Sequence, residues 1–197
     1  MRRLKNLFPI AAFVTLVAPV SAQAAALSIV NVGAPAVNCI FNVTCTEIVT
    51  DSIGTFTPPG DSGSGRLQSR TSPGIAPAPA GSGMDYEYRV DMTEATGSNC
   101  VVSLKLKFGP VIAEPYPPGP VRDVYVVTSG GLGSVGVDSA TQINDGDTYL
   151  TFGPKGVCPG QTSYFFGLTS ATTNPRTGEA IVFFSLGGGS STAVRAP

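Results

Sequence analysis

The residues best suited to chemistry in this chain are three carboxylates on one side of a strand-like run, Asp85, Glu87 and Asp91. Two carboxyl groups about 5 to 9 Å apart supply the acid and the base of sugar hydrolysis. Residues two apart on a strand are spaced by about 7 Å whether or not they do chemistry. We therefore interpret the row as a solvated strand face that Lys105 and Lys107 neutralise. A carboxylate-dependent polysaccharide hydrolase is the enzymatic alternative.

Two short segments match catalytic motifs, but the chemistry behind each is incomplete. Gly60-Asp61-Ser62-Gly63 has the order of a serine-protease nucleophile loop, whose mechanism needs a histidine base, and the chain has no histidine. Residues 131–136 match the dinucleotide spacing G-x-G-x-x-G, but a turn and a strand are expected where a helix must begin to hold the pyrophosphate. The sequence thus predicts no catalytic residue and no cofactor, and we expect that the protein is not an enzyme.

Four oxygen-bearing side chains raise the question of a calcium site. They are Asp138, Asn144, Asp145 and Asp147. With Gly146 at the sixth position, an EF-hand loop would have one carboxylate where three oxygen ligands are needed. Asp-Gly is instead a strong signal for a hairpin turn between arms 141–144 and 147–152. We predict the turn and no metal site.

The even number of cysteines predicts two disulfides in an exported chain. The four are Cys39, Cys45, Cys100 and Cys158. We favour Cys39 with Cys45, because five intervening residues can form a tight turn, which leaves Cys100 for Cys158; sequence alone leaves the other connectivities open. A zinc site is the alternative, but the chain has neither a C-x-x-C pair nor a histidine.

Charge and the N-terminal pattern bound the compartment and the partners. Residues 1–24 have a basic start, a short apolar stretch and the small-residue site Ala22-Gln23-Ala24, as in a cleaved signal peptide of the bacterial type. Cleavage is expected after Ala24, although a cut after Ala22 fits nearly as well. The remaining chain has nine basic and thirteen acidic residues and no basic run. We expect a periplasmic, cell-surface or secreted protein that binds no nucleic acid and has no membrane span.

Period-two patterns dominate the rest of the sequence. Residues 84–92 alternate apolar and charged side chains, and residues 100–108 place apolar ones at every even position. Pairing the two runs as a hairpin would set Glu87 opposite Lys105 on the outer side. No window predicts an α-helix beyond the signal peptide. We predict an all-β fold, an antiparallel β-sandwich of about ten strands with long Gly/Pro-rich loops; a closed β-barrel is the alternative.

A single β-sandwich domain is expected over residues 25–186, with a flexible C-terminal tail over residues 187–197. Residues 109–120 contain five prolines and form the most distinctive loop. The favoured interpretation is a stiff crossover between strands. The alternative is a partner-contact loop that displays Glu114 and Tyr116.

These observations favour a non-catalytic structural or binding domain. Its partner would be a further copy of itself, another surface protein or a glycan, and an apolar edge such as 180–186 would allow assembly by β-augmentation. A carbohydrate-binding module is a second hypothesis, which needs a coplanar row of exposed tyrosines. The hydrolase needs two acids in one concave groove, at least one with a raised pKa.

Overall fold

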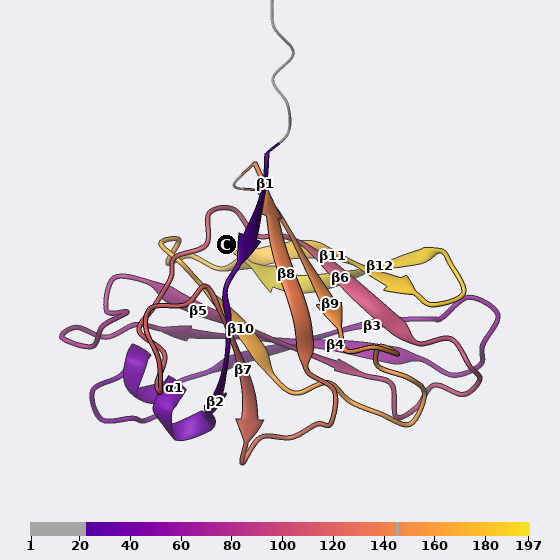
Figure 1. Ribbon diagram of the computed structural model, residues 1–197, viewed down its shortest axis with the longest axis horizontal. Coiled ribbons are helices and arrows are strands. Elements are labelled where there is room, and N and C mark those ends of the chain that lie inside the picture. The colour runs from indigo at the N-terminus through magenta and orange to yellow at the C-terminus, as the bar shows by residue number, and fades with distance from the viewer. Residues whose placement is uncertain (1–22, 145) are drawn as a thin grey trace, which may run out of the picture.

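The computed structural model describes residues 23–144 and 146–197, which form two six-stranded sheets (Figure 1). Sheet A has the order β1 (Ala24–Leu27), β8 (Val137–Ile143), β9 (Asp147–Phe152), β6 (Val101–Lys107), β11 (Arg176–Phe184) and β12 (Gly189–Ala196). Sheet B has the order β2 (Ile29–Gly33), β7 (Val124–Ser129), β10 (Phe166–Ser170), β5 (Met84–Asp91), β4 (Gly65–Pro73) and β3 (Thr50–Phe56). Among the strands of these described residues, only β2 and β7 pair in parallel. The sheets do not close into a barrel, so the predicted β-sandwich is confirmed over its alternative.

The main core lies between the two sheets, because every second residue of each strand points inward. Tyr86, Tyr88 and Val90 of β5 are fully buried there, as are Leu104 and Leu106 of β6. We call this cluster the inner core. The period-two pattern is therefore confirmed for the inner face of the first run and for Leu104, Leu106 and Phe108 of the second. It fails at the start of the second run, where Val101 is fully buried and Val102 only partly.

The predicted hairpin between these two runs is wrong. β5 pairs with β4 and β10 in sheet B, whereas β6 pairs with β9 and β11 in sheet A. Glu87 lies opposite Arg70 of β4, and the Lys105 ammonium lies 2.6 Å from a carboxylate oxygen of Asp147 on β9. The charges of residues 84–92 and of residues 100–108 are thus each paired with charges on another strand. Charge complementarity between the two runs therefore could not identify the strands with which they pair.

The predicted flexible tail is also wrong, because most of it forms β12 at the edge of sheet A. Gly187 and Gly188 turn the chain back from β11 with φ angles of 92° and 81°, which glycine adopts readily. Val194 and Ala196 then point inward and are buried. The glycine run hides this short alternation in the sequence.

The outer strands of the two sheets approach one another on both sides of the sandwich. β1 runs on into β2, so the N-terminal segment forms an edge of sheet A and then of sheet B (Figure 1). On the other side β3 and β12 meet at Gly54, where a Cβ would lie 2.2 Å from the backbone oxygen of Ala193. Residues 180–186, the expected assembly edge, lie mostly in β11 between β6 and β12, so that backbone is already paired.

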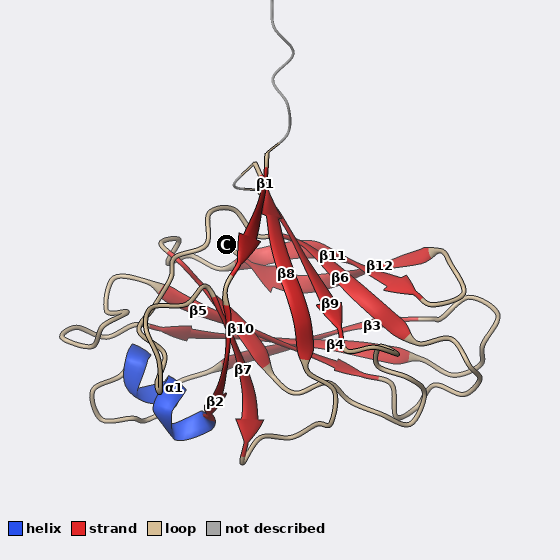
Figure 2. Ribbon diagram, viewed as in Figure 1, coloured by secondary structure: helices blue, strands red, loops and turns tan. Residues whose placement is uncertain are grey.

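Both predicted disulfides, Cys39–Cys45 and Cys100–Cys158, are present. The first holds the end of α1 (Ala34–Phe41), which Figure 2 shows outside the sheets. The sequence did not predict this helix because it has eight residues and lacks a side-chain cap. It is the only helix in the described part of the chain, and it is too short to cross a bilayer.

Two predicted features, the β8–β9 hairpin and the signal peptide, include residues that the structure does not describe. The β8–β9 hairpin is confirmed, with pairing that closes at Ile143 and Asp147 rather than at Asn144, whose φ is 50°. Asp145, in that turn, lies outside the described residues, as does the predicted signal peptide up to residue 22.

Candidate functional site

The outer face of sheet B is covered by what we call the cap, which consists of α1 and the segments 74–83 and 112–120. The backbone N–H of Ala80 donates to the carbonyl of Ile40 at 2.9 Å, so a loop satisfies one of the open carbonyls at the end of the helix. Beneath the cap lies a small apolar cluster separate from the inner core. Its buried members are Val32, Val37, Ile40, Phe41, Ala80, Tyr116, Tyr125 and Val127.

Glu114 and Tyr116 belong to the cap and are buried, so this loop does not display them to a partner. The Tyr116 ring centroid lies 4.8 Å from that of Tyr125, and its hydroxyl lies 2.7 Å from Oγ1 of Thr169. The backbone of Glu114 pairs with that of Arg122. The segment is a crossover from β6 of sheet A to β7 of sheet B, as the favoured interpretation predicts, and its tyrosine turns inward because an apolar cluster is there to receive it.

The cap buries a cluster of three polar side chains, Asp85 and Glu87 of β5 and Tyr125 of β7, which we call the carboxyl cluster. The Tyr125 hydroxyl lies 2.7 Å from each carboxylate oxygen of Asp85 and 2.8 Å from Oε1 of Glu87. Strand β10 separates β5 from β7, and its Gly167 lies opposite both Glu87 and Tyr125. A Cβ at Gly167 would lie 2.2 Å from the hydroxyl oxygen, so the missing side chain lets Tyr125 reach across β10.

The carboxyl cluster needs an additional proton. A hydroxyl has one hydrogen, which cannot serve two carboxyl groups at once, so both Asp85 and Glu87 are hydrogen-bonded to Tyr125 only when one of them is protonated and donates to the phenol oxygen. Burial raises the pKa of Glu87 to about 7. Burial, followed by the nearby charge of Glu87, raises the pKa of Asp85 well above its usual range. The two carboxyls therefore keep a proton to a higher pH than exposed carboxyls do, and their common contact with the Tyr125 hydroxyl lets them share it.

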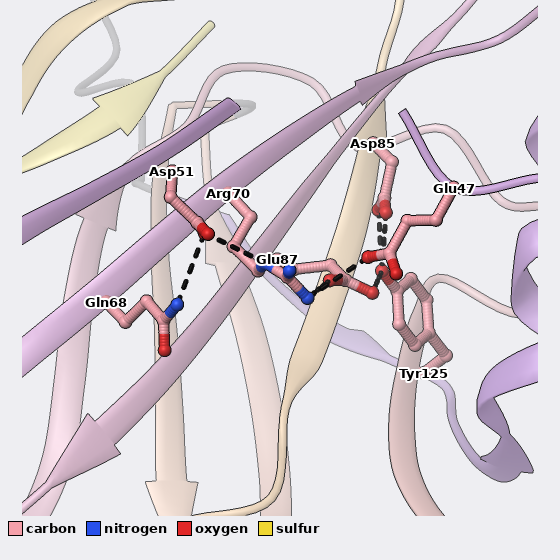
Figure 3. Close-up of polar contacts among 7 residues, drawn as sticks. All are labelled: Glu47, Asp51, Gln68, Arg70, Asp85, Glu87 and Tyr125. Atoms are coloured by element: carbon pink, nitrogen blue, oxygen red, sulfur yellow. Dashed lines mark hydrogen bonds and ion pairs between the residues drawn. The ribbon is translucent and has the colours of Figure 1, made fainter. Parts of the chain in front are cut away.

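Arg70 of β4 links this pair to two more carboxylates (Figure 3). Its Nε lies 2.8 Å from Asp51 of β3, and its Nη1 lies 3.0 Å from Glu47. The same Nη1 is 3.6 Å from Oε2 of Glu87, which is an ion-pair distance but too long for a hydrogen bond. The register of β3, β4 and β5 sets this arrangement, since Arg70 lies opposite Asp51 on one side and Glu87 on the other.

A pocket of about 170 Å³ lies at the margin of the cap, beside Glu87. Its lining combines α1, the segment after it, strands β4, β5 and β7, the loop after β7 and the residue before β10. The lining residues are Ala34, Asn38, Glu47, Arg70, Glu87, Val127, Gly130, Gly131, Leu132 and Phe165. Glu87, which is 8% exposed, is the member of the buried pair that reaches the pocket. Asp85, which is 2% exposed, lies behind it. A wider hollow is lined by β3, β11 and β12, mainly by small residues.

The sequence analysis singled out Asp85 and Glu87 but placed them on a solvated face, whereas both are buried. Asp91 lies apart from them, with its carboxylate accepting from the Thr93 hydroxyl at 2.6 Å. No motif or spacing pointed directly to Tyr125 or Arg70. Gly167 is the residue that could have suggested the site, because a glycine inside a strand often marks a close approach.

The other candidate motifs have structural roles. Asp61 accepts the backbone N–H of Asn99 at 2.8 Å, and β8 rather than a helix follows residues 131–136. The row of exposed tyrosines needed for a carbohydrate platform is not formed, because four of the six are buried. These are Tyr86, Tyr88, Tyr116 and Tyr125. In the described part of the chain, no three acidic or cysteine side chains are grouped so as to hold a metal ion.

The pocket therefore offers a carboxylate that can gain or lose a proton, a guanidinium held by several carboxylates, and an apolar wall that includes Phe165. Such a combination can bind a small polar molecule, and the raised pKa gives Glu87 the protonation behaviour of an acid–base group. Comparison of the chain with protein-family models, with curated proteins and with solved structures found no match in any of the three.

Proposed function

We propose that this protein is an exported, non-catalytic binding domain and that its ligand occupies the pocket beside Glu87. The observation that carries this proposal is the position of Glu87, a buried carboxylate that lines a pocket and whose side chain is hydrogen-bonded on the inner side, to Tyr125. A buried charge is costly without partners, so a carboxylate kept at the wall of a pocket is a natural ligand contact. The volume of about 170 Å³ suits a small molecule or the end of one side chain.

Export is supported by the N-terminal pattern and by the two disulfides, which form and persist in oxidising compartments. β1 begins at Ala24, and the backbone N–H of Gln23 donates to Oδ1 of Asn144 at 3.1 Å. Cleavage after Ala22 would keep both features, whereas cleavage after Ala24 would remove the first residue of β1. Intact mass of protein purified from an exporting host identifies the cut, and retention of the first 22 residues would contradict export.

The binding proposal is tested by NMR on the ¹⁵N-labelled chain with a panel of neutral monosaccharides, free amino acids and small amines. We expect at least one class to shift the amide signals of Asn38, Gly130 and Gly131 in a saturable manner. Asn38→Phe should fill the pocket and abolish the shifts. Val43→Phe, which adds the same ring at a residue that is 53% exposed, is the matched control and should bind as the wild type does. A panel that leaves these three amides unmoved would reject the proposal.

A carboxylate-dependent hydrolase is the second candidate, favoured by one observation: Glu47 and Glu87 line the same pocket, and burial raises the pKa of Glu87 to about 7. The small volume and the contact of both carboxylates with Arg70 argue against a polysaccharide substrate. Release of reducing ends from a panel of polysaccharides, lost in Glu87→Gln, would establish this activity. No release by the wild-type chain would dismiss it.

A further inference from the structure

The charges that surround Glu87 are unevenly balanced. Its neighbours come from β3, β4, β5, β7, the segment after α1 and the cap. The titratable and charged groups among them are Glu47, Asp51, Arg70, Asp85, Arg89, Glu114, Tyr116 and Tyr125. Arg70 is the one cation of this set that forms ion pairs with the pocket carboxylates, because Arg89 contacts Asp91 at 3.9 Å. Several carboxyls therefore share a single guanidinium at the pocket.

Arg70 is already committed to other partners. Its Nε and Nη1 contact Asp51 at 2.8 Å and Glu47 at 3.0 Å, whereas Glu87 stands 3.6 Å away. Within the described residues, Oε2 of Glu87 has no hydrogen bond, and it is not enclosed, so the small exposed part of this residue, 8%, faces the pocket. An ionised Glu87 would thus present one carboxylate oxygen to the pocket without a close donor from the protein, so a ligand in the pocket could supply that donor.

We propose that the pocket binds an organic cation, an ammonium or guanidinium group, and that the proton shared by Asp85 and Glu87 is released to solvent when the cation binds. This inference rests on the proposed function and specifies its ligand. The cation supplies the donors that Oε2 lacks, and its charge replaces the proton that the pair held. Phe165 is consistent with this chemistry, because its ring already lies 5.0 and 5.1 Å from the guanidinium carbons of Arg70 and Arg89.

The test compares two probes that differ in charge but not in shape, N-acetyl-arginine amide and N-acetyl-citrulline amide. Binding is followed through the amide signals of Asn38, Gly130 and Gly131 between pH 5 and pH 8. We expect the arginine probe to bind about tenfold or more tightly at pH 8 than at pH 5, because the ionised pair dominates only at the higher pH. The citrulline probe should bind weakly at both. Agmatine, tested in the same way, shows whether the natural ligand is a free small cation or a protein side chain. Tighter binding of agmatine than of the arginine probe indicates a free cation, and the reverse indicates a side chain.

Two variants assign the effect to the pair. Glu87→Gln should remove the preference for the arginine probe over the citrulline probe at every pH. Asp85→Asn should keep the preference and bind the arginine probe more tightly at pH 5 than the wild type does, because the like charge that holds the proton is gone. Should either variant fail to fold, the wild-type comparison of the two probes decides alone.

The outcomes separate this inference from the proposed function. Equal binding of both probes, or binding of the arginine probe that does not change between pH 5 and pH 8, would overturn the inference and leave a ligand pocket in place. Saturable binding of a neutral monosaccharide but of neither cation would do the same. Failure of every panel member and both probes to move the pocket amides would overturn both.

Discussion

The inner core and the carboxyl cluster are both buried, but different interactions hold them. In the inner core, apolar side chains fill the space, and tyrosine hydroxyls reach its margin, where Tyr86 and Tyr88 each donate to one backbone carbonyl. Beneath the cap, Tyr125 meets two carboxyl groups that must share a proton. Period-two alternation explains the first region. The second depends on a cover of loops and one short helix, so it carries the chemistry that could serve binding.

The largest effect should come from the inner core. Leu104→Ala removes a fully buried side chain between the sheets and should lower the free energy of unfolding by about 2 to 5 kcal/mol, measured by urea denaturation. The pH dependence of unfolding should remain that of the wild type, because the mutation leaves the carboxyl cluster intact. A loss below about 1 kcal/mol would show that the sheets can close over the cavity.

The carboxyl cluster should make stability depend on pH. Burial raises the pKa of Glu87 to about 7 and that of Asp85 well above its usual range, so between about pH 4 and pH 7 the folded state holds more protons than the unfolded state. The free energy of unfolding should therefore fall as pH rises through this window, by an amount on the order of 1 to 3 kcal/mol. Urea denaturation at pH 5 and pH 8 measures the difference.

Asp85→Asn should reduce this fall, because it removes one of the two acids that repel each other. Asp138→Asn, on the exposed side of β8, is the control and should keep the wild-type slope. Stability that is constant or rises from pH 5 to pH 8 in the wild type would contradict the shared proton.

A smaller difference should separate two tyrosine hydroxyls. Tyr125→Phe leaves two buried carboxyls without their common partner and should cost roughly 1 to 3 kcal/mol. Tyr88→Phe removes a single bond to the carbonyl of Arg195 and should cost about 0.5 to 1.5 kcal/mol. Both changes delete one oxygen from a fully buried ring. Equal losses of unfolding free energy, measured by thermal or urea unfolding, would mean that the hydroxyl contributes equally to stability in the two regions.

Much of the fold could be predicted because it depends on local pattern. The inner faces of β5 and of most of β6, the pairing of Cys39 with Cys45 and the β8–β9 hairpin follow from alternation, short spacing and Asp-Gly. The partners of β5 and β6 could not, because a row of charges finds complements on several strands. β12 was missed because glycine and serine obscure its alternation.

The candidate site could be predicted only in part. Asp85 and Glu87 were identified by residue type, but charged residues seldom lie in the interior, so the sequence favoured a solvated face. Their burial depends on α1 and on the inward turn of Tyr116, and neither has a local signal of sufficient length. Gly167 carried the one clue, and its meaning became clear only once Tyr125 was placed across it.

The passage of the N-terminal strands from one sheet to the other sets the order in which the chain can fold. Gln23 bonds to Asn144 across a separation of 121 residues, and β2 pairs with β7. When the chain is made or exported N-terminus first, β1 and β2 are therefore available long before the strands with which they pair. Sheet A is completed only by β12, at the far end of the sequence. We therefore expect the complete sandwich to form only after most of the chain has been made, whereas the consecutive strands β3, β4 and β5 can pair earlier.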